Sequence, residues 1–386
     1  MRVHYTLKAL SERFFITLLL LGNKNELIKS NIKNLEIIII PRIYQSKKLF
    51  NIILRFCGLI YTIFTSLKFS NFIINYVEFT PKRVLKHVNL LNYKIILFEY
   101  WHFTSLAKLV KKLNIFSIVD THNVLWQTYK VSLESSFLPT FISKYYINKY
   151  KKYEENYALK FFDIIIAINF LEKKYFETII NSNQKTLFCP MGIDLNKWPN
   201  LNLTEKNEAS IFFYGGIGSK HNETAVKFLI NDVFPLIIKE IPFFKIYIIG
   251  SKPSEEIKKL NNDQNIIITG FVDNPNLIFN KLGIAVIPWK GTYGFRSRII
   301  EIMSSGNLVI TSKDALYGMG FEDGKDVVFV EGNDPKLWSD TIINQYKNNT
   351  NTKSIVNNAL MKVNNLYSYD KSYRILVENI YKKINL

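Results

Sequence analysis

Short apolar runs alternate along this chain with segments whose apolar residues recur at helical spacing. In the first half, the apolar runs predict strands over residues 15–21, 35–40, 94–99, 116–120, 163–168 and 186–190. Helical spacing predicts helices over 5–13, 46–66, 103–113, 140–161 and 170–180. This order is typical of βαβ units that build a parallel sheet.

A polar stretch over residues 198–210 separates this half from a second series of the same kind. Here the pattern predicts strands over 210–214, 245–250, 266–269, 282–288, 308–311 and 326–330, and helices over 223–234, 254–260, 275–281, 335–347, 353–366 and 371–384, with one more opening near Arg296. We therefore predict an α/β protein of two doubly wound, Rossmann-like domains, residues 1–200 and 208–368, that face each other across a cleft. The final helix, within 369–386, is expected to cross back onto the first domain, and it and the linker are expected to act as a hinge.

Two hydrophobic stretches bear on membrane contact. Residues 14–21 resemble the apolar part of a signal peptide, but no small-residue cleavage site follows, and we predict a buried strand. Residues 49–67 are long enough to span a bilayer, but Asn51 and Arg55 lie inside them, and Lys47, Lys48 and Lys68 flank them. An aromatic-rich helix between lysines suits one that lies in a membrane interface or packs on the sheet.

Composition narrows the class of protein only partly. The 386 residues carry a net charge of +18, but the abundance of Asn, Ile, Lys, Phe and Tyr indicates AT-rich codons, and the lysines are spread along the whole chain. A nucleic-acid binder would cluster that charge on one face, so we predict no nucleic-acid partner. Two distant cysteines indicate a reducing compartment. The five histidines form no zinc signature, and no Asp-x-Asp ends a strand, so we predict no metal.

The segment from 282 to 311 carries the most informative chemistry. A buried strand is followed by a glycine-containing loop, and then by a helix whose first turns carry Arg296, Arg298 and Glu301. A helix that starts at the carboxyl ends of a parallel sheet favours anions, and arginine offers a planar fork for phosphate oxygens. A carboxylate one turn further on can accept hydrogen bonds from sugar hydroxyls. The segment predicts a nucleotide-sugar site, although Arg298 and Glu301 could also be an ordinary surface ion pair.

A glycine turn opens the second domain. Gly215 and Gly216 follow a predicted strand, but His221 stands where the dinucleotide fingerprint needs its third glycine. Either the turn lets the backbone approach a phosphate or it is simply a tight βα connection.

These motifs, in this order, resemble the group 1 (family 4) glycosyltransferases, which have the GT-B fold. The resembling pieces are YGGIGSKHN at 214–222, TGFVDN at 269–274, VIPW at 286–289, GFRSRIIEIMSSGNLVIT at 294–311, YGMGFEDGKD at 317–326, VDTHN at 119–123 and CPMGID at 189–194. Residues 2–21 resemble the family's first helix and second strand, so the first strand and its glycine loop are expected to be missing. In that case the sheet loses a middle strand, and activity is in doubt.

The resemblance implies a retaining transfer of a hexose from an NDP-sugar to a glycan or lipid-linked acceptor, in bacterial cell-surface polysaccharide synthesis. It implies His122, Arg298 and Glu301 as catalytic residues, with Arg296 and Arg298 on the diphosphate, Glu301 on the ribose and His122 on the donor sugar. Gly215, Gly216, Gly294 and Phe295 would complete the donor site. No cofactor or metal is implied, and the expected location is the cytoplasm or the inner face of the cell membrane.

The sequence also departs from the family. Its usual lysine is Arg298, and its first acid is replaced by Tyr293. Two other functions stay open: a catalytically degenerate GT-B scaffold, and a nucleotide-sugar epimerase of the same fold, for which we identify no acid/base carboxylates.

Overall fold

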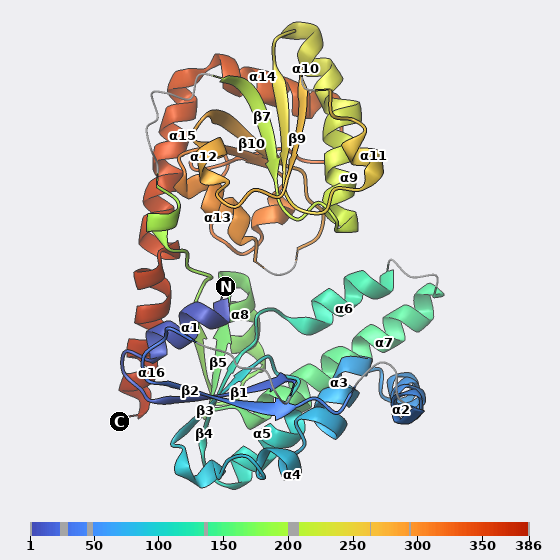
Figure 1. The fold of residues 1–386 in the computed structure, drawn as a ribbon, viewed down its shortest axis with the longest axis vertical. Coiled ribbons are helices and arrows are strands. Elements are labelled where there is room, and N and C mark those ends of the chain that lie inside the picture. Colours follow the sequence, from blue (N-terminus) through green and yellow to red (C-terminus); the bar gives the residue numbers. More distant parts are fainter. Residues whose placement is uncertain are drawn as a thin grey trace. The chain divides into compact units, whose positions relative to one another are not determined.

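The chain divides into two compact units, each described here by itself. The computed structural model describes residues 2–23, 30–44, 49–134, 138–199, 208–262, 264–292 and 295–384. Unit 1 comprises Met1–Pro190 and Tyr373–Leu386, and unit 2 comprises Met191–Ser372. Figure 1 shows strands flanked by helices in each unit.

Unit 1 has two parallel sheets. One pairs β1 (Ile16–Gly22) with β2 (Leu35–Pro41), and the other has the order β3 (Ile95–Glu99), β4 (Phe116–Asp120), β5 (Ile164–Ala167) and β6 (Lys185–Phe188). The helices are α1 (Arg2–Leu10), α2 (Leu49–Thr65), α3 (Phe69–Ile73), α4 (Pro81–Val84), α5 (Thr104–Lys112), α6 (Leu125–Glu134), α7 (Thr140–Tyr153), α8 (Phe170–Ile179) and α16 (Ile375–Ile384).

An apolar pocket of about 530 Å³ separates the two sheets of unit 1. Residues of β1 and β3 line it, with side chains of α1 and α5 around them. Neither strand has a described strand partner on its edge toward the pocket. Consequently β1 is only half-buried along most of its length, and the predicted buried strand over 15–21 is in that respect wrong.

Unit 2 has one six-stranded parallel sheet, of order β12-β11-β10-β7-β8-β9. The strands are β7 (Glu208–Tyr214), β8 (Lys245–Ile249), β9 (Ile266–Gly270), β10 (Leu282–Ile287), β11 (Leu308–Thr311) and β12 (Val328–Phe329). The helices are α9 (Lys220–Phe228), α10 (Phe234–Glu240), α11 (Glu255–Lys258), α12 (Asn276–Phe279), α13 (Ser297–Ser304), α14 (Pro335–Lys347) and α15 (Asn349–Lys362). The strand order reverses between β7 and β10, which is where open α/β sheets bind ligands.

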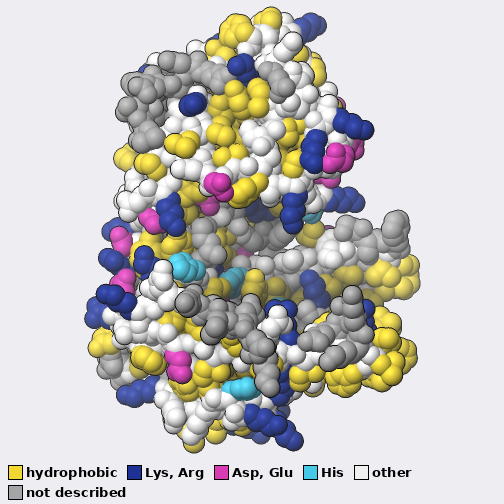
Figure 2. Space-filling view, in the orientation of Figure 1, with side chains coloured by type: hydrophobic (Ala, Val, Ile, Leu, Met, Phe, Trp, Pro, Cys, Tyr) yellow, Lys and Arg dark blue, Asp and Glu magenta, His cyan; other side chains and the backbone are white. Residues whose placement is uncertain are grey.

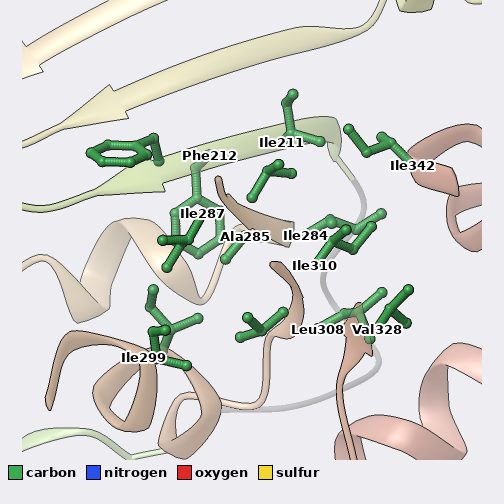
Figure 3. Close-up of a cluster of buried hydrophobic side chains, with 14 of the residues drawn as sticks. Ile211, Phe212, Ile284, Ala285, Ile287, Ile299, Leu308, Ile310, Val328 and Ile342 are labelled. Carbon is green, nitrogen blue, oxygen red and sulfur yellow. The ribbon is translucent and has the colours of Figure 1, made fainter. Parts of the chain in front are cut away.

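The core of unit 2 is built from both strands and helices. Figure 3 shows side chains of β7, β10, β11 and β12 meeting those of α13 and α14. Ile299 of α13 is fully buried in this cluster. Burial of the apolar side of α13 fixes the rotation of that helix about its axis. Arg298 and Glu301 therefore point away from this hydrophobic cluster.

Helix α6 is absent from the sequence prediction, and its amino end explains why. The N–H of Trp126 donates to Glu154 Oε2 at 3.0 Å, and Glu172 accepts from the N–H of Val124. Both carboxylates are buried and come from distant helical segments, so no local capping residue marks the start of α6. Two further helices have bounds that differ from the prediction. The first helix begins at Arg2 rather than residue 5. The helix expected over 223–234 begins at Lys220, and helical segments follow it without a break to Glu240.

Candidate functional site

A pocket of about 300 Å³ lies at the carboxyl ends of three strands of unit 2. Tyr214 ends β7, Ile249 ends β8, and the residues after β9 are Phe271 and Val272. These line the pocket together with Gly215, Gly216, Gly250, Ser251, Ser297, Arg298 and Glu301. The amino end of α13 therefore faces a concave site at the point where the strand order reverses.

Two glycines allow the loops after β7 and β8 to meet. A Cβ at Gly250 would lie 1.7 Å from the carbonyl oxygen of Gly215, which no side chain can accommodate. A Cβ at Gly215 would lie 2.0 Å from Nη1 of Arg298. By contrast, a Cβ at Gly216 would meet nothing within 4 Å. The glycine turn therefore lets backbone and a guanidinium come together, and its approach to a phosphate stays a prediction.

Arg298 is half-buried beside this turn, and part of the hydrogen-bonding capacity of its guanidinium is unused. Its Nη1 donates to Oδ1 of Asn222 at 3.0 Å, and Asn222 Nδ2 donates to the carbonyl of Gly216 at 2.7 Å. Its Nε and Nη2 are buried and have no hydrogen-bond partner among the described residues. Burial lowers the pKa of Arg298 to about 10, and Tyr214 and Glu301 only partly offset this. A cation with unpaired buried donors calls for an anion.

Glu301 faces Tyr214 across the pocket wall. Burial raises the pKa of the Glu301 carboxyl to about 7, and a hydrogen bond from Tyr214 and the charge of Arg298 oppose that shift. Burial and the neighbouring Glu301 carboxylate together raise the pKa of Tyr214. Arg298 and Glu301 are thus parts of a buried pocket and not the surface ion pair that their spacing also allowed.

Two predicted donor-site residues, Arg296 and Phe295, do not line this pocket. Arg296 stacks its guanidinium over the ring of Trp289 at 3.9 Å, and its Nη2 donates to the carbonyl of Gly291 at 3.3 Å. Phe295 packs toward Tyr367, with the ring centroids 5.7 Å apart. Gly294, like Tyr293, lies outside the described residues.

In unit 1, His122 belongs to a second polar cluster. Its Nε2 lies 2.6 Å from Glu99 Oε2, and its ring stacks on Tyr100 with centroids 4.2 Å apart. Burial raises the pKa of Glu99, and His122 opposes this shift. Both His122 and Tyr100 have positive φ, 58° and 73°, a conformation that non-glycine residues adopt mainly where the surroundings enforce it.

Arg2 anchors the same cluster. Its Nε and Nη2 donate to the two oxygens of Asp120 at 2.8 and 3.0 Å, and its Nη1 donates to the carbonyl of Cys189 at 2.9 Å. Glu99, Asp120 and His122 offer ligand atoms within 4.8 Å of one another. However, Arg2 already engages both oxygens of Asp120, so the arrangement fits an ion-pair network better than a metal site.

Sequence reasoning missed Glu99, Tyr214 and Asn222 as site residues. A usable signal existed for Glu99, because it ends β3 where Asp120 ends the adjacent β4, and the two are paired in register. Carboxyl ends of neighbouring parallel strands meet at one edge of a sheet.

Comparisons with known proteins agree with this geometry. Residues 208–348 match the family described as "Glycosyl transferases group 1". The chain is 26% identical over 175 residues to an uncharacterized 44.6 kDa protein in the cps region of Klebsiella pneumoniae, covering 43% of this chain and 45% of that protein. It is 28% identical over 174 residues to a poly(glycerol-phosphate) alpha-glucosyltransferase of Bacillus subtilis (strain 168), covering 42% of this chain and 25% of that protein. Both matches thus span less than half of the relative.

Solved structures share the fold over nearly the whole chain. Sucrose-phosphate synthase from Thermosynechococcus elongatus superposes with a TM-score of 0.66 at 14% identity, covering 99% of this chain and 92% of that one. Anabaena HepE in complex with UDP and glucose gives a TM-score of 0.59 at 12% identity, covering 97% and 95%. The predicted GT-B fold and the resemblance to group 1 glycosyltransferases are confirmed, the resemblance through residues 208–348.

Proposed function

We propose that the chain is a retaining glycosyltransferase that moves a hexose from an NDP-sugar to a glycan or lipid-linked acceptor. The observation that carries this proposal is the guanidinium of Arg298, two of whose buried nitrogens have no partner among the described residues, beside a glycine turn and a helix amino end. A diphosphate supplies the oxygens and the charge that this group lacks.

Arg298 would act mainly on the leaving group. As the bond to the sugar breaks, negative charge develops on the diphosphate, and donors already held in place stabilise it without reorganising. The proposal assigns this charge stabilisation to Arg298 and the amino end of α13, with no metal ion or cofactor. Arg296 would assist only after leaving Trp289.

The remaining pocket walls suit a nucleoside. The carboxylate of Glu301 can accept hydrogen bonds from ribose hydroxyls, and Phe271 and Val272 offer an apolar surface to the base. Gly215 makes room for Arg298, and Gly216 leaves the backbone open to the phosphates. Gly294 and Phe295 are proposed to contact the donor as well.

His122 is proposed as a residue that contacts the donor sugar. Glu99 and Tyr100 fix the orientation of the His122 ring. A side chain that contacts a sugar in one geometry needs such a fixed orientation. Replacing it with Ala is expected to lower transfer about 100-fold while leaving nucleotide affinity unchanged. Equal loss of nucleotide binding would argue against this role.

The names of two relatives support a role in surface polymers. The Bacillus subtilis protein is named for glucosylation of poly(glycerol phosphate), and the Klebsiella pneumoniae protein is encoded in a cps region. We propose that this chain uses an acceptor of the same general kind. We also propose that it acts in the cytoplasm, at the inner face of the membrane. In the described part of the chain no single helix is both long and apolar enough to cross a membrane, whereas α2 and the segment Phe69–Glu78, bent by 117° from each other, reach that length and composition only together.

Calorimetric titration with UDP, GDP and ADP tests the proposal first. One of these is expected to bind, and its sugar conjugates then serve as substrates in an NMR assay. Retention predicts that a sugar released from an α-linked donor appears first as the α anomer. The Lys290→Ala variant serves as the control for Arg298→Ala, since Lys290 does not line the pocket. A folded chain that binds none of the three would contradict the proposal and favour the scaffold.

A further inference from the structure

Helix α2 exposes most of its hydrophobic side chains. Nine large apolar residues of this 17-residue helix have from 39% to 75% of their surface accessible: Leu49, Phe50, Ile52, Ile53, Phe56, Leu59, Ile60, Ile63 and Phe64. Only Asn51 and Gly58 are buried. Soluble monomers rarely expose a contiguous apolar surface of this kind, so the patch calls for a partner.

The attachments of α2 leave these side chains pointing outward. At Gly58 the helix lies so close to α3 that a Cβ there would stand 2.1 Å from the ring of Phe69. At its carboxyl end, Lys149 Nζ donates to the carbonyl of Phe64 at 2.6 Å, and Tyr146 Oη donates to that of Ile63 at 3.2 Å. Unit 1 thus contacts α2 closely at Gly58 and binds its last carbonyl groups. The nine exposed apolar side chains have no described partner.

The exposed surface continues onto α7. Phe141 and Tyr145 of that helix have 74% and 59% of their surface accessible. Figure 2 shows hydrophobic side chains gathered over α2 and α7 at the edge of unit 1. We call these outward residues of the two helices the apolar face.

The two helices that carry the apolar face are basic, although Lys151 is paired with Glu155 at 3.6 Å. Within their bounds α2 and α7 contain five basic residues and no acidic one: Arg55, Lys144, Lys149, Lys151 and Lys152. A second copy of the chain seated on the same face would oppose like charges across the contact. A membrane with anionic lipids would instead attract them while burying the apolar side chains.

The shape favours lying on a bilayer over crossing it. At 17 residues α2 extends about 26 Å, less than the ~30 Å of hydrocarbon, and Arg55 stands near its middle. The segment Phe69–Glu78 turns away by 117° instead of continuing the axis. An amphipathic helix in the interfacial plane meets both conditions.

We propose that α2, together with Phe141 and Tyr145 of α7, docks the chain onto the surface of a membrane that contains anionic lipid. This goes beyond the proposed function, because it names the partner and the residues that bind it and does not depend on nucleotide binding.

Vesicle flotation of the full chain tests the proposal. Flotation is expected with phosphatidylcholine vesicles that contain phosphatidylglycerol, and it is expected to weaken at least several-fold with phosphatidylcholine alone. Cys57 of α2 is exposed whereas Cys189 is buried, so an environment-sensitive dye on the natural Cys57 thiol reports insertion directly. Its emission is expected to shift to the blue only when vesicles are present.

Substitutions distinguish binding through the apolar face from non-specific hydrophobic binding. Ile53→Ser with Phe56→Ser is expected to lower vesicle partitioning more than tenfold, since each removes a large apolar side chain from the contact. Phe243→Ser, at an equally exposed phenylalanine of unit 2, is the matched control and should change nothing. An unchanged thermal unfolding transition in every variant shows that the fold survives.

Three results would overturn the proposal. One is a wild-type chain that stays with the soluble fraction, and another is equal flotation of the double variant and the control. The third is a stable dimer in sedimentation that Ile53→Ser with Phe56→Ser dissociates, which would assign the apolar face to a second copy. Loss of nucleotide binding with intact flotation would instead contradict only the proposed function.

Discussion

Asn222 holds Arg298 from a position 76 residues earlier in the chain, through a hydrogen bond of 3.0 Å from Nη1 to its side-chain oxygen. The amide nitrogen of Asn222 also binds the carbonyl of Gly216, so one side chain joins the glycine turn to the arginine. The guanidinium is thereby aimed before any ligand arrives, which lowers the cost of binding one.

Asn222→Ala is therefore expected to weaken NDP binding by about tenfold, because Arg298 loses its fixed orientation. Calorimetry of the full chain measures this, with Asn365→Ala, at an exposed asparagine of unit 2, as control. Unchanged affinity in Asn222→Ala would show that Arg298 is oriented by other contacts.

Alanine substitutions at Gly250 and Gly216 test the close approach of the loops that form the pocket. Gly250→Ala would force a Cβ against the Gly215 carbonyl, and we expect a loss of about 2 kcal/mol in unfolding free energy together with most nucleotide affinity. Gly216→Ala places its Cβ in open space and should leave stability nearly unchanged. Thermal unfolding of both variants decides the matter, and equal destabilisation would contradict the close approach of the two loops.

If Glu301 recognises the ribose, the chain should prefer ribonucleotides over deoxyribonucleotides. Substitution of Glu301 should abolish this preference. The wild-type chain should bind an NDP about tenfold more tightly than the 2′-deoxy form, whereas Glu301→Gln should discriminate far less. Since burial raises the pKa of Glu301 to about 7, this preference should grow between pH 6 and pH 8 as the carboxyl ionises. Glu322→Gln, at an exposed glutamate, provides the control. Retained discrimination in Glu301→Gln would place the ribose elsewhere.

Glu154 makes stability depend on pH. Burial raises the pKa of its carboxyl to about 8, above the unfolded value of ~4.3, so the folded chain binds the proton more tightly than the unfolded chain does. Stability from this group is therefore fully present below about pH 4 and falls as pH rises toward 8, by up to ~1.4 kcal/mol per pH unit.

Glu154→Gln should remove this dependence while still accepting the hydrogen bond from Trp126. The variant is expected to equal the wild type near pH 5 and to exceed it by roughly 3–4 kcal/mol at pH 8. Urea unfolding at both pH values measures the difference, beside the exposed Glu134→Gln. Parallel curves for the wild type and Glu154→Gln would show that Glu154 is ionised in the folded chain.

The periodic parts of the fold were predictable, and the long-range contacts were not. Strands 116–120 and 308–311 have the predicted bounds because their apolar runs are short and sharply ended. Helix α6 escaped prediction because Glu154 and Glu172 cap it from far along the chain. At the site, Arg298 and Glu301 were found from residue type and spacing, but the contacts of Arg298 to Asn222 and of Glu301 to Tyr214 depend on how β7 and α13 are brought together.

The most direct test of the account compares a nucleoside, its monophosphate and its diphosphate for binding to the wild type and to Arg298→Ala. We expect the wild type to gain about 100-fold from nucleoside to diphosphate and the variant only a few-fold, with equal affinity of both for the nucleoside. An equal gain in both chains would contradict the claim that Arg298 holds the diphosphate. A parallel loss of nucleoside affinity in the variant would contradict it as well, because Arg298 would then serve only to shape the pocket.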